Sequence, residues 1–125
     1  MSAARVLVVD DDPEIRDLLR DALSGDGYLV DCAGDAADAL AFIREQIYAV
    51  ALVDFDLPDM NGVMLHRKMR EMDPELASAT LFMSGMAQQA EHLDYYSNAS
   101  GGFFPKPFVV PDVVAEVRRL VRRSR

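Results

Sequence analysis

The chain has 125 residues, of which 50% are hydrophobic and 27% are charged, and its formal net charge is −8. This length suits a single domain with one core, and the composition argues for a folded protein without an apolar stretch long enough to cross a membrane. The acidic balance argues against direct binding of nucleic acid, because much of the affinity for nucleic acid comes from cationic contacts with phosphates.

Strand and helix patterns alternate along the chain, and glycine or proline marks many of the boundaries. Asp12 is predicted to cap a helix whose first turn contains Pro13. The predicted elements, in chain order, are strand Arg5–Val9, a helix from Pro13 to Gly25 and Gly27, strand Tyr28–Ala33, helix Ala36–Ile47, strand Ala49–Val53, a turn-rich loop over 57–62, helix Val63–Met72, a loop at Pro74, strand Thr80–Met83, a helix with poor apolar periodicity at 87–98, strand Gly102–Phe104 and a helix from Pro111.

Five strand–helix units in series predict an α/β fold, namely a flavodoxin-like, doubly wound, five-stranded parallel sheet with five helices. Right-handed crossovers make 2-1-3-4-5 the economical strand order. In that order the first and third strands are neighbours, and ligands bind where the carboxyl ends of these strands meet.

Carboxylates follow both of these neighbouring strands. Asp10-Asp11-Asp12 comes directly after the first apolar run, and Asp54 ends the third. Like charges gathered at one sheet edge repel one another, so the cluster needs a cation. A site of oxygen ligands alone favours a hard divalent ion such as Mg²⁺, and a carboxylate beside Mg²⁺ is suited to phosphoryl chemistry.

Two further polar residues are predicted to reach the same edge, because Ser84 ends the fourth strand and Lys106 follows the fifth. If a carboxylate oxygen of Asp54 accepts a phosphoryl group, Mg²⁺ held by Asp11 and Asp54 neutralises charge on the phosphoryl oxygens. Lys106 then supplies a second cation, and the Ser84 hydroxyl donates a hydrogen bond to one of these oxygens.

With these motifs the chain strongly resembles the receiver domain of two-component response regulators. The motifs, in order, are Val8-Val9-Asp10-Asp11, Asp54-x-x-Leu57-Pro58-x-x-x-Gly62, Ser84-Gly85 and Lys106-Pro107-Phe108. The resemblance covers essentially the whole chain. It implies a single receiver domain over residues 1–125 with no output domain in this chain, and the chain also looks similar to receivers at the C-terminus of hybrid histidine kinases.

The resemblance implies a role for each acidic residue of the edge. Asp54 is the expected phosphoacceptor and a metal ligand. Asp11 is expected to bind Mg²⁺ or Mn²⁺ directly, Asp10 to act through water, and Asp56 to offer its backbone carbonyl. Asp12 is left as the helix cap.

The resemblance also implies roles on the phosphoryl side of the site. Ser84 is expected to move towards the phosphoryl group on activation, and Lys106 matches the family's lysine at this place. The peptide bond before Pro107 is expected to be cis, which is common only before proline. Phe103 stands where many receivers carry a tyrosine, so any switch movement of Phe103 is expected to be driven by packing alone.

The implied function is two-component signal transduction. A phosphoryl group passes to Asp54 from the phosphohistidine of a histidine kinase or a histidine phosphotransfer protein, and slow self-dephosphorylation removes it. The phosphoryl bond shifts a conformational switch, read by the face made of residues 87–98, the fifth strand and the last helix. The protein is expected to be a cytoplasmic phosphoprotein, monomeric or weakly dimeric, with an unknown output partner, and not a free-standing metabolic enzyme.

Two alternatives stay open. Asp54-Phe55-Asp56 resembles the nucleophile and acid/base pair of haloacid-dehalogenase-type phosphohydrolases, although Pro58 stands where Thr or Val is usual and Asp10-Asp11 would have no role. The second alternative is a degenerate receiver used only as an interaction module, against which the complete acidic, serine and lysine set argues. His66 and His92 are predicted to be surface residues and not phosphohistidines.

Overall fold

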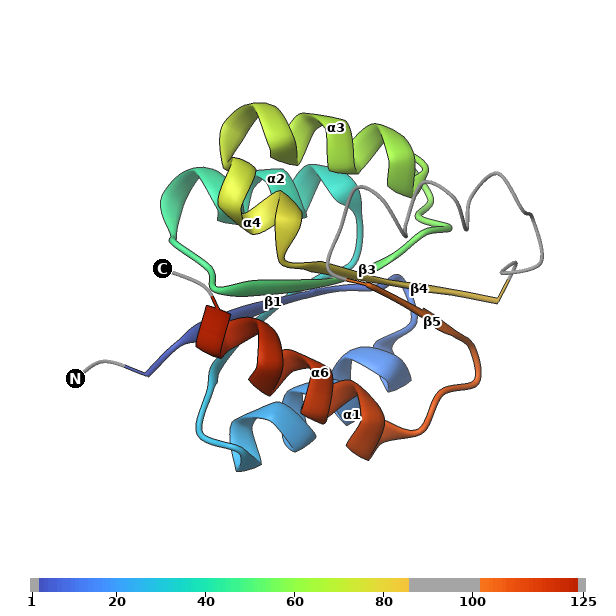
Figure 1. The fold of residues 1–125 in the computed structure, drawn as a ribbon. Coiled ribbons are helices and arrows are strands. Elements are labelled where there is room, and N and C mark those ends of the chain that lie inside the picture. The colour runs from blue at the N-terminus through green and yellow to red at the C-terminus, as the bar shows by residue number, and fades with distance from the viewer. Residues whose placement is uncertain (1–2, 86–101, 124–125) are drawn as a thin grey trace.

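The computed structural model describes residues 3–85 and 102–123. A sheet lies between two layers of helices, with α2, α3 and α4 on one face and α1 and α6 on the other (Figure 1). The elements are β1 (Arg5–Val9), α1 (Pro13–Gly25), β2 (Leu29–Ala33), α2 (Ala36–Glu45), β3 (Val50–Asp54), α3 (Gly62–Met72), α4 (Pro74–Ser78), β4 (Thr80–Ser84), β5 (Gly102–Pro105) and α6 (Val110–Arg123).

The sheet has five strands in the order β2-β1-β3-β4-β5, and every neighbouring pair is parallel. The predicted flavodoxin-like, doubly wound fold and its strand order are therefore confirmed. Two registers matter for the site, because Val9 lies opposite Val53 and Asp54 opposite Met83. The residues that directly follow β1, β3 and β4 consequently emerge side by side at one edge.

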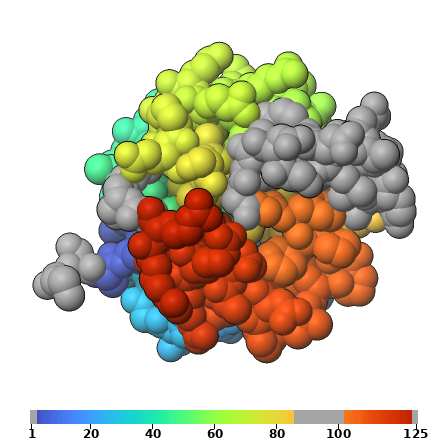
Figure 2. Space-filling model, in the orientation of Figure 1, coloured from blue at the N-terminus to red at the C-terminus, as the bar shows by residue number. Residues whose placement is uncertain are grey.

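Successive residues of the strands face two separate cores in turn, as the two-residue period of a strand requires. On β1, Leu7 and Val9 pack against α2, α3 and α4, whereas Val6 and Val8 pack against α1 and α6. All five residues of β3 are buried, so this strand is covered on both faces. Figure 2 shows how α6 and the segment leading into it cover the lower half of one side of the molecule.

Side-chain caps fix the helix starts next to the sheet edge. Asp12 accepts a hydrogen bond from the backbone N–H of Glu14, as predicted, and Pro13 occupies the first turn of α1. Asn61 caps α3 in the same way through the N–H of Met64. These caps hold the loops that follow β1 and β3, which carry the acidic residues of interest.

The loop predicted at Pro74 is wrong, because residues Pro74–Ser78 form the short helix α4. Asp73 accepts a hydrogen bond from the N–H of Leu76, and Pro74 stands in the first turn, where its missing N–H costs nothing. In the other direction, the second helix ends at Glu45 and not at Ile47, whose side chain is 72% exposed. Helix ends are the least certain part of any prediction from sequence.

The predicted surface position of His66 is also wrong. The residue is 0% exposed, and its Nε2 lies 2.8 Å from the Ala77 carbonyl oxygen. The rings of His66 and Phe82 pack in a T-shaped arrangement with their centroids 5.4 Å apart. A buried imidazole is acceptable here because α4 supplies a hydrogen-bond partner. The predicted helix at 87–98 and His92 lie outside the described residues. Within the described residues, no helix is long and apolar enough to span a bilayer.

Candidate functional site

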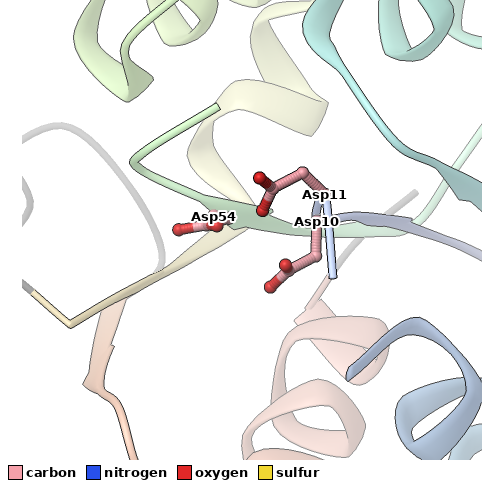
Figure 3. Close-up of side chains that lie close together, drawn as sticks. All are labelled: Asp10, Asp11 and Asp54. Carbon is pink, nitrogen blue, oxygen red and sulfur yellow. The ribbon is translucent and has the colours of Figure 1, made fainter. Parts of the chain in front are cut away.

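Three carboxylates meet where β1 and β3 end. Oxygen atoms of Asp10, Asp11 and Asp54 lie within 4.8 Å of one another, and Figure 3 shows the three side chains gathered at these strand ends. Asp10 is 0% exposed and Asp54 is 4% exposed, whereas Asp11 is open to solvent. The cluster is thus half sheltered by the fold, with one carboxylate facing solvent.

Lys106 brings a cation to the cluster from the end of β5. Its Nζ lies 2.8 Å from Asp10 Oδ2 and 3.4 Å from Asp54 Oδ2. The backbone is anchored because the Lys106 N–H donates to the Ser84 carbonyl oxygen, and the following Lys106–Pro107 peptide bond is cis. Burial alone lowers the pKa of Lys106, but its hydrogen bond to Asp10 and the negative charge of Asp54 outweigh burial and raise it.

The pKa of Asp54 stays raised although Lys106 lies close to it. Burial is the largest influence and raises the pKa of Asp54 from 3.8 to about 6, and the charge of Asp10 adds to this. The backbone N–H of Asp56 and the Lys106 ammonium act in the opposite direction without cancelling it. Ionising Asp54 therefore costs more free energy in this fold than in water, and a further positive charge nearby would lower that cost.

The donor set fits a hard divalent cation. Three carboxylates, one of them open to solvent, offer oxygen ligands at mutual distances that one small ion can bridge. Mg²⁺ keeps several of its water molecules, and the exposed side of Asp11 leaves room for them. A cation bound here would also offset part of the burial and Asp10 charge that raise the pKa of Asp54.

Ser84 and Asp56 complete the edge. Ser84 ends β4 with 1% exposure, and its hydroxyl donates to Asp56 Oδ2 at 3.1 Å. Asp56 follows β3 and is exposed. Its N–H donates to Asp54 Oδ1 at 3.1 Å, and a backbone bridge to Asn61 fixes the loop. The structure therefore brings Asp10, Asp11, Asp54, Asp56, Ser84 and Lys106 to one sheet edge.

Phe103 lies apart from this polar cluster. It sits on β5 opposite Phe82 of β4 and is partly buried against the core under α2, α3 and α4. The switch role of Phe103 stays a prediction.

The sequence reasoning missed Arg16. From α1, Arg16 Nη1 donates to the Asp10 carbonyl oxygen at 2.8 Å, and a Cβ added at Gly34 would lie 3.3 Å from the same nitrogen. This contact ties α1 to the backbone of a cluster residue and passes close to the loop after β2. No local motif signals it, because a guanidinium six residues after Asp10 reaches back along the helix only in the folded chain.

A hollow of about 420 Å³ opens beside the cluster. Its lining is mostly apolar and comes from α1 and from the segment between β5 and α6, namely Ile15, Leu18, Lys106, Pro107 and Phe108. Leu18 lies on α1 and is 47% exposed, so its side chain is accessible from the hollow. Lys106 belongs both to this hollow and to the acidic cluster.

Comparison with known proteins gives one consistent result. The family model for the response regulator receiver domain matches residues 6–118. The chain is 32% identical over 123 residues to the transcriptional regulatory protein TrcR of Mycobacterium tuberculosis, covering 98% of this chain and 47% of that protein. It is also 32% identical over 120 residues to the virulence transcriptional regulatory protein PhoP of Salmonella typhimurium, covering 96% of this chain and 53% of PhoP.

Solved structures agree with the sequence relatives. A CheY-like response regulator receiver domain protein from Methanospirillum hungatei superposes with a TM-score of 0.89 at 28% identity, covering 98% of this chain and 96% of that one. The chain spans about half the length of the two curated relatives, at 47% and 53%. The similarity therefore concerns one domain of those regulators.

Proposed function

Because the chain belongs to the response regulator receiver domain family, we propose that Asp54 accepts a phosphoryl group from a phosphohistidine. Receivers of this family act in two-component signalling and are not metabolic enzymes. The donor is a histidine kinase or a histidine phosphotransfer protein. The observation that carries the proposal is the convergence of Asp10, Asp11 and Lys106, from the ends of β1 and β5, on the buried carboxylate of Asp54 at the end of β3.

Each residue of the edge has a task in this proposal. Asp11 and Asp54 would hold Mg²⁺ or Mn²⁺ directly, Asp10 through water, and Asp56 through its backbone carbonyl. The bound ion would neutralise charge on the phosphoryl oxygens during transfer. The Asp54 oxygen forms the new bond to phosphorus, the histidine nitrogen leaves, and Lys106 holds the phosphoryl group by charge.

Ser84 and Phe103 would link phosphorylation to a change of shape. The Ser84 hydroxyl turns towards a phosphoryl oxygen, and Phe103, on the neighbouring strand, repacks with it. A ligand shifts such an equilibrium only through contacts that differ between the two states, and the hydrogen bond from Ser84 is such a contact. Slow loss of the phosphoryl group to water restores the first state.

The hollow beside the cluster is the proposed contact for the phosphodonor. A donor histidine has to approach Asp54 from the open side, and the hollow shares Lys106 with the cluster. Its apolar lining around Leu18 suits a helical partner surface with apolar side chains. We also propose that residues 1–125 form one receiver domain, cytoplasmic and monomeric or weakly dimeric, with an output partner still to be identified.

The phosphohydrolase alternative fits less well. It assigns no task to Asp10 and Asp11, yet both lie within 4.8 Å of Asp54. In that alternative Asp56 is the general acid/base, but its carboxylate already accepts a hydrogen bond from the Ser84 hydroxyl. The interaction-only alternative leaves the raised pKa of Asp54 and the buried contacts of Lys106 without a purpose.

The test is intact-mass spectrometry after incubation with acetyl phosphate, with and without Mg²⁺, on wild type and Asp54→Asn. A gain of about 80 Da that needs Mg²⁺ and is absent from the variant is the expected result. No gain on wild type would favour the interaction-only module. Turnover of small phosphate esters would instead favour the phosphohydrolase.

A further inference from the structure

The starting observation is the contact between Ser84 and Asp56. The Ser84 hydroxyl donates to Asp56 Oδ2 at 3.1 Å, although Ser84 itself is 1% exposed and Asp56 lies on the solvent side of the edge. A hydrogen bond to an ionised acceptor is stronger than one between neutral groups. The hydroxyl is thus held by a charged partner before any phosphoryl group is present.

The loop that carries Asp56 is built to keep this contact in place. The Asp56 N–H donates to Asp54 Oδ1, and a backbone bridge pairs Asp56 with Asn61, the cap of α3. On the other side, Ser84 is fixed at the end of β4 by its pairing with Pro105 of β5. Both partners are therefore anchored by backbone contacts independent of the side-chain hydrogen bond.

A serine hydroxyl has a single hydrogen and donates it to one acceptor at a time. We propose that the Asp56 carboxylate is a positioning residue that competes with the phosphoryl group for the Ser84 hydroxyl and so holds the receiver in its unphosphorylated arrangement. This inference rests on the proposed function of Asp54. When Ser84 turns to a phosphoryl oxygen, the Asp56 carboxylate loses its donor and stays near a new negative charge, so both effects oppose phosphorylation.

The test is a double-mutant cycle on binding of beryllofluoride, a stable phosphoryl analogue, in the presence of Mg²⁺. Isothermal titration calorimetry compares wild type, Asp56→Ala, Ser84→Ala and the double variant. Asp56→Ala is expected to tighten binding in the wild-type background. In the Ser84→Ala background, the factor by which Asp56→Ala tightens beryllofluoride binding is expected to be about fivefold smaller, because no Ser84 hydroxyl remains for Asp56 to hold.

Two further variants separate the hydrogen bond from simple charge and from folding. Asp35→Asn removes one acidic charge from the cap of α2 while keeping a cap side chain, and it is expected to leave the affinity close to that of wild type. Asp56→Asn keeps the shape of the side chain and an acceptor oxygen, so it is expected to fall between wild type and Asp56→Ala.

The outcomes separate the two proposals. If wild type does not bind beryllofluoride, the proposed function fails and the competition fails with it. If wild type binds, but Asp56→Ala changes the affinity by the same factor with Ser84 or Ala at position 84, the proposed function stands and the competition is overturned.

Discussion

At the scale of single residues, the site is organised around the cost of ionising Asp54. Burial raises the pKa of this carboxyl to about 6, and Lys106 only partly compensates. The meeting of Asp10, Asp11 and Asp54 could be predicted from the sequence, because the carboxyl ends of neighbouring parallel strands lie side by side. The need for a cation could also be predicted, because clustered carboxylates repel one another. The sequence did not allow Arg16 or the partner of Ser84 to be predicted, because both contacts depend on side-chain directions that no local pattern encodes.

Asp54→Asn is expected to stabilise the protein at pH 7.5 without divalent ions, by roughly 1–3 kcal/mol. The folded state holds the Asp54 proton more tightly than the unfolded state, so this stabilising protonation is present below pH 3.8 and lost as pH rises through about 6. Urea unfolding at pH 7.5 checks the difference. Adding Mg²⁺ is expected to stabilise wild type clearly more than the variant, and equal stabilisation would contradict the assignment of Asp54 as a ligand.

The stability of the fold is expected to depend on pH through His66. Burial, together with the charge of Arg70, lowers the pKa of His66 below 6.5 despite the bond to Ala77. The unfolded state therefore binds the proton more readily, so the stabilisation is present above pH 6.5 and lost as pH falls towards the lowered value. Between pH 7.5 and 5.5, wild type is expected to lose more stability than His66→Gln in urea unfolding.

Gln is the matched control at this position, since its amide nitrogen can donate to the Ala77 carbonyl oxygen without titrating. Other groups, including Asp54, titrate in the same range, so only the difference between the two proteins reports on His66. Parallel pH profiles for the two proteins would rule out the predicted effect.

At the scale of elements, the loops after β1 and β3 are fixed by caps and by close packing. The helices α1, α2, α3 and α6 could be predicted from apolar periodicity, and the strand order followed from the alternation of strands and helices with right-handed crossovers. α4 could not, since a five-residue helix has too few positions to show a period and Pro74 also suits a loop. His66 was misplaced for the same reason, because the helix that covers it was not foreseen.

Gly62 is expected to be required at the start of α3. A Cβ at this position would lie 2.5 Å from Phe55 Cδ2 and 3.1 Å from Phe82 Cε1, in a buried region. Gly62→Ala is therefore expected to destabilise the protein by about 1–3 kcal/mol and to loosen the loop behind Asp54. The midpoint of thermal or urea unfolding measures the effect.

Gly25 offers a matched control, because nothing lies within 4 Å of an added Cβ there. As the last residue of α1, its replacement by alanine is expected to be neutral or slightly stabilising. Equal unfolding midpoints for the Gly62→Ala and Gly25→Ala variants would show that the crowding at Gly62 is not a constraint.

At the scale of the whole molecule, the acidic cluster and Lys106 lie at the carboxyl ends of the strands, and a mostly apolar hollow lies beside them. The topology explains this arrangement, since parallel strands place all their carboxyl ends together. The hollow could not be predicted from sequence, because its lining joins α1 to the segment after β5, far apart along the chain.

Leu18→Arg is expected to slow phosphoryl transfer from a protein donor at least tenfold while leaving phosphorylation by acetyl phosphate nearly unchanged. The reason is that the arginine puts a charged side chain into the proposed partner contact in the hollow, whereas acetyl phosphate does not need that contact. Ile47→Arg is the control, because Ile47 is 72% exposed and precedes β3. It therefore lies at the amino ends of the strands, opposite the acidic cluster. If Leu18→Arg slowed both routes alike, or neither, the docking proposal would be wrong.

The central claim is that the phosphoryl group resides on Asp54, and borohydride reduction tests it most directly. Reduction converts a phosphorylated aspartate to homoserine, and trypsin releases residues 45–67, which contain Asp54, Asp56 and Asp59, as one peptide. After treatment with acetyl phosphate and Mg²⁺, fragment masses are predicted to place homoserine at position 54. Homoserine at position 56 or 59, or on another peptide, would contradict the account.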